Sequence, residues 1–412
     1  MYAGYTKHNS CGDELAPVEE ATVTPFEQSE YETRVAETKS RMRAAEIDTL
    51  FVTDPANMNY LSGYDGWSFY VHQGLLVSLD HEQPVWVGRE MDANGAKATV
   101  WIDHEHIHSY SDDHVHSPVG KHPMDYVASV VESLGRDDTT IGVEMDAAYY
   151  TARSHERLQR ELPEASFVDA TLLVNEVRLR KSDREIEYIE QATQISEAAM
   201  QAGLDALEPG VPESTVAAAI YHTLIEGVDG FGGDYPAIVP LMPSGDHTGT
   251  PHLTWSDRPF EAGDPVIVEL AGCRHRYHSP LARTAVVGEP TPEMQRVADV
   301  VVEGLNAALD VAEPGVTCEA VERAWRESIA RHGVEKESRI GYSMGCGYPP
   351  DWGEHTASLR PGDETVLEEN MTFHMIPGIW YDEFGVEISE SFRVTATGAE
   401  RFSSFPQQLF SV

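Results

Sequence analysis

The sequence predicts an α+β fold with two domains, of which the second carries an internal repeat. Residues 195–220 combine an apolar helical pattern, the residues Glu-Pro-Gly-Val and a second amphipathic pattern, and residues 300–325 repeat this order. Two copies indicate a duplicated half-domain rather than a solenoid. Helical and extended patterns alternate before the repeat, and two extended runs lie between its copies. These three observations favour an α/β domain followed by a pseudo-two-fold α+β domain.

The first domain is expected to cover residues 29–175, after an irregular, polar and acidic arm over residues 1–28. It should begin with a helix over 30–45 and a buried strand over 49–53, which Asp54-Pro55 ends. The pattern then predicts strands over 74–79, 85–87 and 141–144, and helices over 123–134 and 147–161.

A run of histidines interrupts these elements. His104, His106 and His108 would share one face of a strand, and His114 and His116 follow closely. Imidazoles on one face are typical of transition-metal sites, but nothing in this spacing closes a ligand set. We interpret the run as a solvated edge and leave a weak metal affinity open.

The second domain is expected to cover residues 181–412. It begins at Ser182, which forms a capping box with Glu185 ahead of a strongly periodic helix. Further on, an apolar strand leads to Glu269, a break is expected at Ala271-Gly272, and residues 277–284 return as a partner strand. A carboxylate that ends a buried apolar run is costly unless it is paired or functional, which makes Glu269 a candidate.

Composition excludes several classes of partner. The 412 residues include 69 Asp and Glu against 29 Lys and Arg, a formal net charge of −40. This charge opposes binding to nucleic acid and to anionic membranes. It is typical of a halophilic source, whose salt screens the repulsion between acidic groups. Four cysteines without C-x-x-C spacing, no signal peptide and no membrane-spanning apolar run predict a cytoplasmic protein with free thiols.

The sequence around Glu269 resembles the creatinase/prolidase family, whose second domain has the pita-bread fold. Residues 263–284 read GDPVIVELAGCRHRYHSPLART, and residues 55–64 read PANMNYLSGY, close to the family's frames in both domains. The family's metallopeptidases hold a metal pair with five side chains. Their positions fall here on Glu269, Pro280, Tyr342, Ile376 and Ser389. Since four of these five residues cannot bind a metal ion in the family's manner, the resemblance implies a metal-free member without a cofactor.

Hydrolysis without a metal requires a carboxylate nucleophile or base and an electrophile that is already activated. A cationic amidinium or guanidinium carbon fits an acidic pocket. The runs 64–72, 227–240 and 348–354 resemble the metal-free branch of the family that opens the ring of ectoine. His355, where arginine is expected, and residues 375–377 depart from that branch.

This resemblance implies a role for each candidate residue. Glu269 would attack the amidine carbon or direct water to it, His252 would shuttle the proton, and Glu390 would orient His252 or bind the amidinium. The product would be an N-acetylated 2,4-diaminobutyrate. The family also implies a homodimer in which the first domain covers the partner's cleft. The predicted substrate-binding residues are Trp67, Tyr70, Tyr235, His278, Tyr342, Glu354 and His374.

Three alternatives stay open at this point. A creatinase-type enzyme would hydrolyse a guanidino compound by the same kind of metal-free mechanism. An Xaa-Pro peptidase-like protein is opposed by Pro280 and Ile376, which offer no metal ligand. A non-catalytic family member would tolerate the lost ligands, but it would not need His252 and Glu269.

Overall fold

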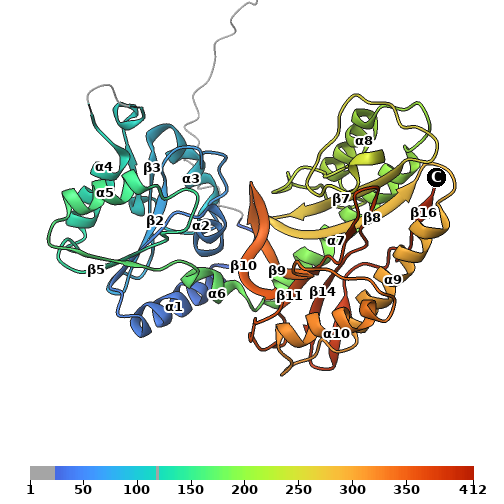
Figure 1. Ribbon diagram of the computed structural model, residues 1–412. Helices are drawn as coiled ribbons and strands as arrows, with labels where there is room; N and C mark the ends of the chain where they lie inside the picture. Colours follow the sequence, from blue (N-terminus) through green and yellow to red (C-terminus); the bar gives the residue numbers. More distant parts are fainter. Residues whose placement is uncertain (1–23, 117–119) are drawn as a thin grey trace, which may run out of the picture.

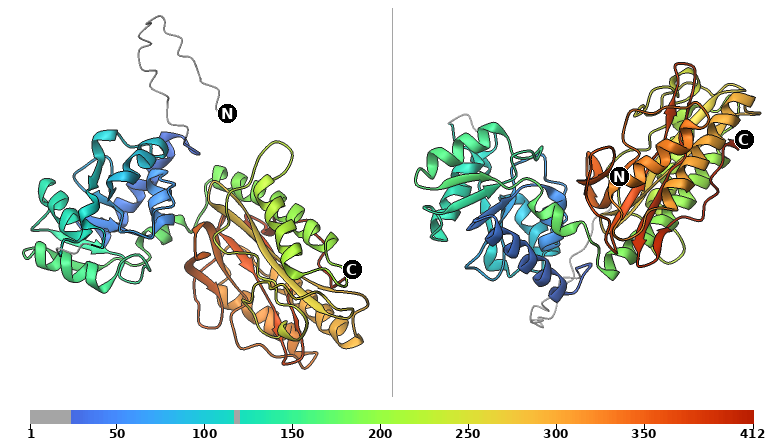
Figure 2. Two further views of the ribbon diagram at one scale, coloured as in Figure 1. Left: turned by 90° about the horizontal axis from the view of Figure 1, so that it is seen from above. Right: turned by 60° about the horizontal axis from the view of Figure 1, so that its bottom comes forward.

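The computed structural model describes residues 24–116 and 120–412, so most of the expected N-terminal arm, residues 1–23, lies outside the described part. Two domains lie side by side and are joined by α6 (Leu173–Arg178) and the residues that follow it (Figures 1 and 2). Within the described residues, no helix combines the length and the apolar character needed to cross a bilayer.

The first domain is a six-stranded sheet in the order β4-β3-β2-β1-β5-β6, covered on both faces. Alternate residues of β1 point to opposite cores: Leu50 packs with α1, α2 and α3, whereas Phe51 packs with α4 and α5. The strands are β1 (Thr49–Val52), β2 (Gly74–Ser78), β3 (Val85–Arg89), β4 (Ile107–Tyr110), β5 (Thr140–Val143) and β6 (Ser166–Asp169). The helices are α1 (Gln28–Ala44), α2 (Pro55–Ser62), α3 (Ala93–Thr99), α4 (Pro123–Ser133) and α5 (Ala152–Glu161).

One expectation in this domain, the start of a helix, needs correction. The helix predicted from residue 147 begins at Ala152, because the Thr151 side chain accepts a hydrogen bond from Ser154 N at 3.1 Å and caps it there. The histidine run, interpreted as a solvated edge, lies at the edge of the sheet: residues His104–His106 make a 3₁₀ turn, and only His108 lies in the edge strand β4. Among the described residues, no group of three or more His, Cys, Asp or Glu could hold a metal ion.

The second domain contains the predicted repeat. Helices α7 (Asp183–Asp205) and α8 (Glu213–Glu226) pack against β7 and β8, whereas α9 (Pro292–Leu309) and α10 (Cys318–Ala330) pack against the other half of the sheet. The capping box is present, since Ser182 N donates to Glu185 Oε2 at 2.8 Å. The strands are β7 (Pro265–Arg274), β8 (Tyr277–Val286), β9 (Gly341–Tyr348), β10 (Asp351–Leu359), β11 (Thr372–Met375), β12 (Ile379–Trp380), β13 (Gly385–Val386), β14 (Glu390–Thr395), β15 (Gly398–Arg401) and β16 (Phe410–Ser411).

The β7–β8 hairpin runs without the break that the sequence suggested. Ala271 pairs with Pro280 and Gly272 with Ser279, so Glu269 lies in the middle of β7, opposite Ala282. The small residues serve packing instead: a Cβ on Gly272 would lie 2.1 Å from the Ala192 carbonyl oxygen of α7. The close approach of α7 thus fixes the face of β7 that lies opposite the Glu269 side chain.

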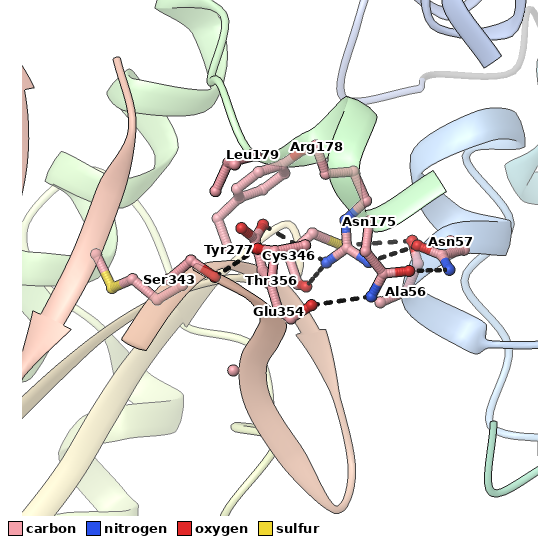
Figure 3. A network of polar contacts seen from close by, with 12 residues as sticks. Ala56, Asn57, Asn175, Arg178, Leu179, Tyr277, Ser343, Cys346, Glu354 and Thr356 are labelled. Carbon is pink, nitrogen blue, oxygen red and sulfur yellow. Dashed lines mark hydrogen bonds and ion pairs between the residues drawn. The ribbon is translucent and has the colours of Figure 1, made fainter. Parts of the chain in front are cut away.

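A buried polar network joins the two domains (Figure 3). Asn57 of α2 donates to Asn175 of α6 at 2.8 Å, and Asn175 donates to the Glu354 carbonyl oxygen of β10 at 3.0 Å. The Glu354 carboxylate lies 2.9 Å from Lys181 Nζ and 3.7 Å from Arg178 Nη2. The junction therefore contains an ion-pair cluster rather than a simple apolar contact.

Candidate active site

Two buried carboxylates lie together in the second domain: Glu269 on β7 and Glu387, which follows β13. They are 6% and 3% exposed. Burial, together with the charge of Glu387, raises the pKa of Glu269 well above its ordinary value, and burial raises the pKa of Glu387 to about 7. In the described part of the chain, Oε1 of Glu387 is buried without a hydrogen-bond partner. The pair thus retains a proton near neutral pH and has free acceptor capacity for a cationic ligand.

An aromatic wall faces Glu269. In the antiparallel hairpin, the side chains of Glu269 and Ala271 share one face with those of Pro280 and Ala282. On this face Ala271 packs with the fully buried ring of Trp352 and with Tyr342. Burial and, less strongly, the charge of Glu269 raise the pKa of Tyr342.

Tyr342 belongs to a hydrogen-bonded chain. Its oxygen accepts from Trp352 Nε1 at 2.8 Å and lies 3.1 Å from His374 Nδ1, while His374 Nε2 lies 2.8 Å from Ser389 Oγ. Burial lowers the pKa of His374 to about 3, so the ring is neutral. If the buried Ser389 hydroxyl donates to Nε2, then Nδ1–H donates to Tyr342. The Tyr342 hydroxyl then accepts two hydrogen bonds, and its own proton remains free for a ligand beside Glu269.

This chain of hydrogen bonds occupies positions where the resembling metallopeptidases hold their metal ligands. Tyr342 and Ser389 are both bonded to His374, and the side chains of Pro280 and Ile376 contain no donor atom. Glu269 alone keeps a ligand-type side chain at its position. The residues present therefore do not fit a metal pair.

His252 lies on a loop next to the strand that carries Glu269. Leu241 exchanges both backbone hydrogen bonds with Glu269, at 2.8 and 2.9 Å, and Met242 N donates to Leu253 O at 2.9 Å. His252 is exposed and has a φ of 68°, in the left-handed region that is costly for a non-glycine residue. Its role as a proton shuttle stays a prediction.

Three predicted residues have other partners than the carboxylate pair. Glu390 is bonded to Arg283 Nη2 at 2.8 Å, and the alternation of β8 directs Arg283 to the face opposite Glu269. His278 is fully buried, its Nε2 accepts from Ala237 N at 2.8 Å, and burial lowers its pKa to about 3. Glu354 lies at the domain junction. These contacts hold all three side chains in place, and their predicted roles toward a substrate stay predictions.

Trp67 and Tyr235, which were predicted to bind substrate, lie where the two domains of one chain meet. The Trp67 ring lies 4.7 Å from the Tyr235 ring, and Arg276 stacks on Tyr235 at 3.7 Å. Arg276 also lies 3.4 Å from Asp65 of the first domain. Trp67 and Tyr70 remain 57% and 70% exposed, so neither is enclosed by the chain itself.

The structure brings two further residues to the site. No role was predicted for Glu387, which stands in the frame GVEISE over residues 385–390. Lys336, a buried lysine beside Glu387, was not singled out at all. Glu387 had a signal in the sequence, because it stands between the buried apolar residues Val386 and Ile388. Lys336 stands between the exposed Glu335 and Glu337 and had no such signal.

Comparisons with known proteins agree with this architecture. Residues 187–396 match the metallopeptidase family M24, and residues 34–180 match the creatinase/prolidase N-terminal domain. The chain is 45% identical to an ectoine hydrolase of Halomonas elongata, over 94% of this chain and 98% of that protein. It is 26% identical to an Xaa-Pro dipeptidase of Pyrococcus furiosus, over 88% and 95%.

Solved structures show the same fold at lower identity. A prolidase from Thermococcus sibiricus superposes with a TM-score of 0.81 at 20% identity, over 93% of this chain and 99% of that one. An X-Pro aminopeptidase from Thermotoga maritima gives a TM-score of 0.78 at 22% identity, over 92% and 99%. The expected fold class and the expected enzyme class, a hydrolase, are thus confirmed. The chain belongs to the creatinase/prolidase family of hydrolases.

Proposed function

We propose that this enzyme hydrolyses ectoine to N-acetyl-2,4-diaminobutyrate without a metal ion. The observation that carries the proposal is the buried Glu269–Glu387 pair, whose free acceptor capacity suits a flat amidinium cation. The 45% identity to an ectoine hydrolase over nearly the whole chain supports this substrate. The side chains at the family's metal positions support the metal-free route.

The reaction adds water across the amidinium carbon. That carbon is electron-poor because the positive charge is shared by its two ring nitrogens. A C–O bond forms, one C–N bond breaks, and the released nitrogen leaves as an ammonium group, so that amidinium and water give amide and ammonium. Glu269 either adds to the carbon itself or takes a proton from the attacking water.

The neighbouring residues have distinct tasks in this scheme. Glu387 binds the amidinium and, by its charge, fixes the order in which the two carboxyls ionise. A bound cation favours ionisation of Glu269, which prepares it to act as nucleophile or base. The Tyr342 hydroxyl donates a hydrogen bond to the oxygen that becomes bonded to the amidinium carbon, and so stabilises the charge that develops on that oxygen. His252 carries a proton to the leaving nitrogen.

A comparison of three substrates tests this function. Enzyme treated with EDTA is expected to release a primary amine from ectoine at the rate of untreated enzyme, because none of the proposed steps uses a metal. A creatinase-type enzyme would instead release urea from creatine, and an Xaa-Pro peptidase would release proline from a dipeptide. Loss of activity on EDTA treatment, with recovery on adding a divalent metal, would contradict the metal-free route.

The pH profile tests the carboxylate pair. The charge of Glu387 raises the pKa of Glu269, so Glu387→Gln is expected to lower it and to move the acidic limb of kcat/KM to lower pH. In the wild-type enzyme, burial and the charge of Glu387 raise the pKa of Glu269, so this limb should lie above the ordinary range of a glutamate carboxyl. The measurement is kcat/KM for ectoine from pH 4 to 9. An unmoved limb in the variant would show that the two carboxyls do not interact.

The setting of the enzyme forms part of the proposal. We propose a homodimer in the cytoplasm of a halophile. Family resemblance supports the dimer, and the exposure of Trp67 and Tyr70 leaves these rings available to a partner subunit. The net charge of −40 supports a salt-rich interior.

A further inference from the structure

Lys336 is a buried cation at the edge of the site. Its side chain comes from the segment between α10 and β9, and the residue is 7% exposed. Nζ donates to the Gly378 carbonyl oxygen at 2.8 Å and lies 4.1 Å above the Trp380 ring. Both contacts hold the ammonium group in one place, and the ring face favours a cation there.

The ribbon formed by β12 and β13 places this ammonium beside the carboxylate pair. Ile379 pairs with Val386, so Gly378 and Glu387 face each other at the next position of the ribbon. The Glu387 charge opposes the effect of burial, which lowers the pKa of Lys336 to about 8. No nitrogen–oxygen contact within 4.0 Å joins Lys336 and Glu387. The two groups are neighbours with space between their charges.

A second buried lysine shows what a structural ammonium looks like in this protein. Lys181 Nζ donates to Arg178 O at 2.7 Å, to Leu179 O at 3.1 Å and to Glu354 Oε2 at 2.9 Å, which uses all three of its protons. In the described part of the chain, Lys336 has one acceptor, Gly378 O. Two of the three N–H groups of Lys336 are thus free to donate to a ligand. Since a buried charge without partners is costly, a ligand that accepts from them would stabilise this ammonium group.

We propose that Lys336 binds the carboxylate of the substrate and makes the enzyme specific for a zwitterion. This inference rests on the proposed function. In ectoine the carboxylate is attached to a ring carbon next to an amidine nitrogen, so its two charges are only a few bonds apart. Glu269 and Glu387, with Lys336 beside them, present the complementary charges in the same compact arrangement. Arg339 is the competing cation, stacked 4.5 Å above the Tyr342 ring, but it is exposed to solvent.

The experiment compares two substrates, ectoine and the same cyclic amidine without its carboxylate, 2-methyl-1,4,5,6-tetrahydropyrimidine. Lys336→Met is expected to lower kcat/KM for ectoine by about 30- to 100-fold and that for the carboxylate-free ring by less than about threefold. Lys336→Arg should restore part of the preference, whereas Arg339→Gln should preserve it. Any effect of Lys336 on the ionisation of Glu387 acts on both substrates and cancels in the ratio.

Equal losses for the two substrates in Lys336→Met would overturn the inference, as would loss of the preference in Arg339→Gln. If Lys336→Met does not fold, the wild-type enzyme decides the question. A preference for ectoine over the carboxylate-free ring of at least about 30-fold supports the inference, and a ratio near one contradicts it. A folded wild-type enzyme that leaves both rings intact overturns the proposed function, and the inference with it.

Discussion

Glu269→Gln is expected to lower kcat for ectoine hydrolysis by about 10⁴-fold. The amide that replaces the carboxylate is neither a nucleophile nor a base, yet it has nearly the same shape. Glu269 lies in the middle of β7, and the neighbouring carboxylate, Glu387, has the separate task of binding the amidinium in the proposed scheme. The measurement is the single-turnover rate with enzyme in excess over ectoine.

The fold of this variant should survive. The change removes a buried carboxyl whose ionisation burial and the charge of Glu387 oppose, so the free energy of unfolding is expected to stay equal or to rise. Glu261→Gln is the matched control, because it makes the same chemical change at an exposed position just before the same strand. The control should keep wild-type turnover. A Glu269→Gln enzyme with comparable turnover would remove Glu269 from the mechanism.

Glu354→Ala is expected to destabilise the protein by about 3–5 kcal/mol. The change leaves two buried cations, Lys181 and Arg178, without the carboxylate that lies 2.9 and 3.7 Å from them. Burial raises the pKa of Glu354, and both cations oppose that effect. The free energy of unfolding can be measured by urea denaturation followed by circular dichroism.

The matched control for this prediction is Glu368→Ala. Glu368 lies 2.9 Å from Arg180, but the two side chains are 52% and 65% exposed. Water screens such a surface pair, so its loss should cost no more than about 1 kcal/mol. Equal stability of the two variants would mean that the junction cluster does not hold the domains together.

The elements that the sequence predicted well are specified locally. The capping box at Ser182 involves neighbours three residues apart, and the helical repeat is visible in apolar spacing alone. The continuous strand through Gly272 was missed for the opposite reason. Only glycine fits at this position, because Ala192 of α7, some 80 residues earlier in the sequence, approaches its backbone closely.

The site was predictable where residue type alone excludes a role. Pro280 and Ile376 cannot bind a metal in any geometry. Where a role depends on a partner, sequence was insufficient: the partners of Glu354 and Glu390, Lys181 and Arg283, lie 173 and 107 residues away. The sequence also could not tell that Glu387, three positions before Glu390, belongs with Glu269 while Glu390 lies with Arg283 on the other face.

The most direct test of the proposed chemistry is proton NMR of ectoine incubated with wild-type enzyme in molar KCl and EDTA. We predict that the ring signals disappear and that the methyl signal of an acetyl group replaces them, with no change in a parallel sample of Glu269→Gln. A folded wild-type enzyme that leaves ectoine intact but releases urea from creatine would contradict the proposed substrate. Intact ectoine and intact creatine together would favour a non-catalytic member of the family.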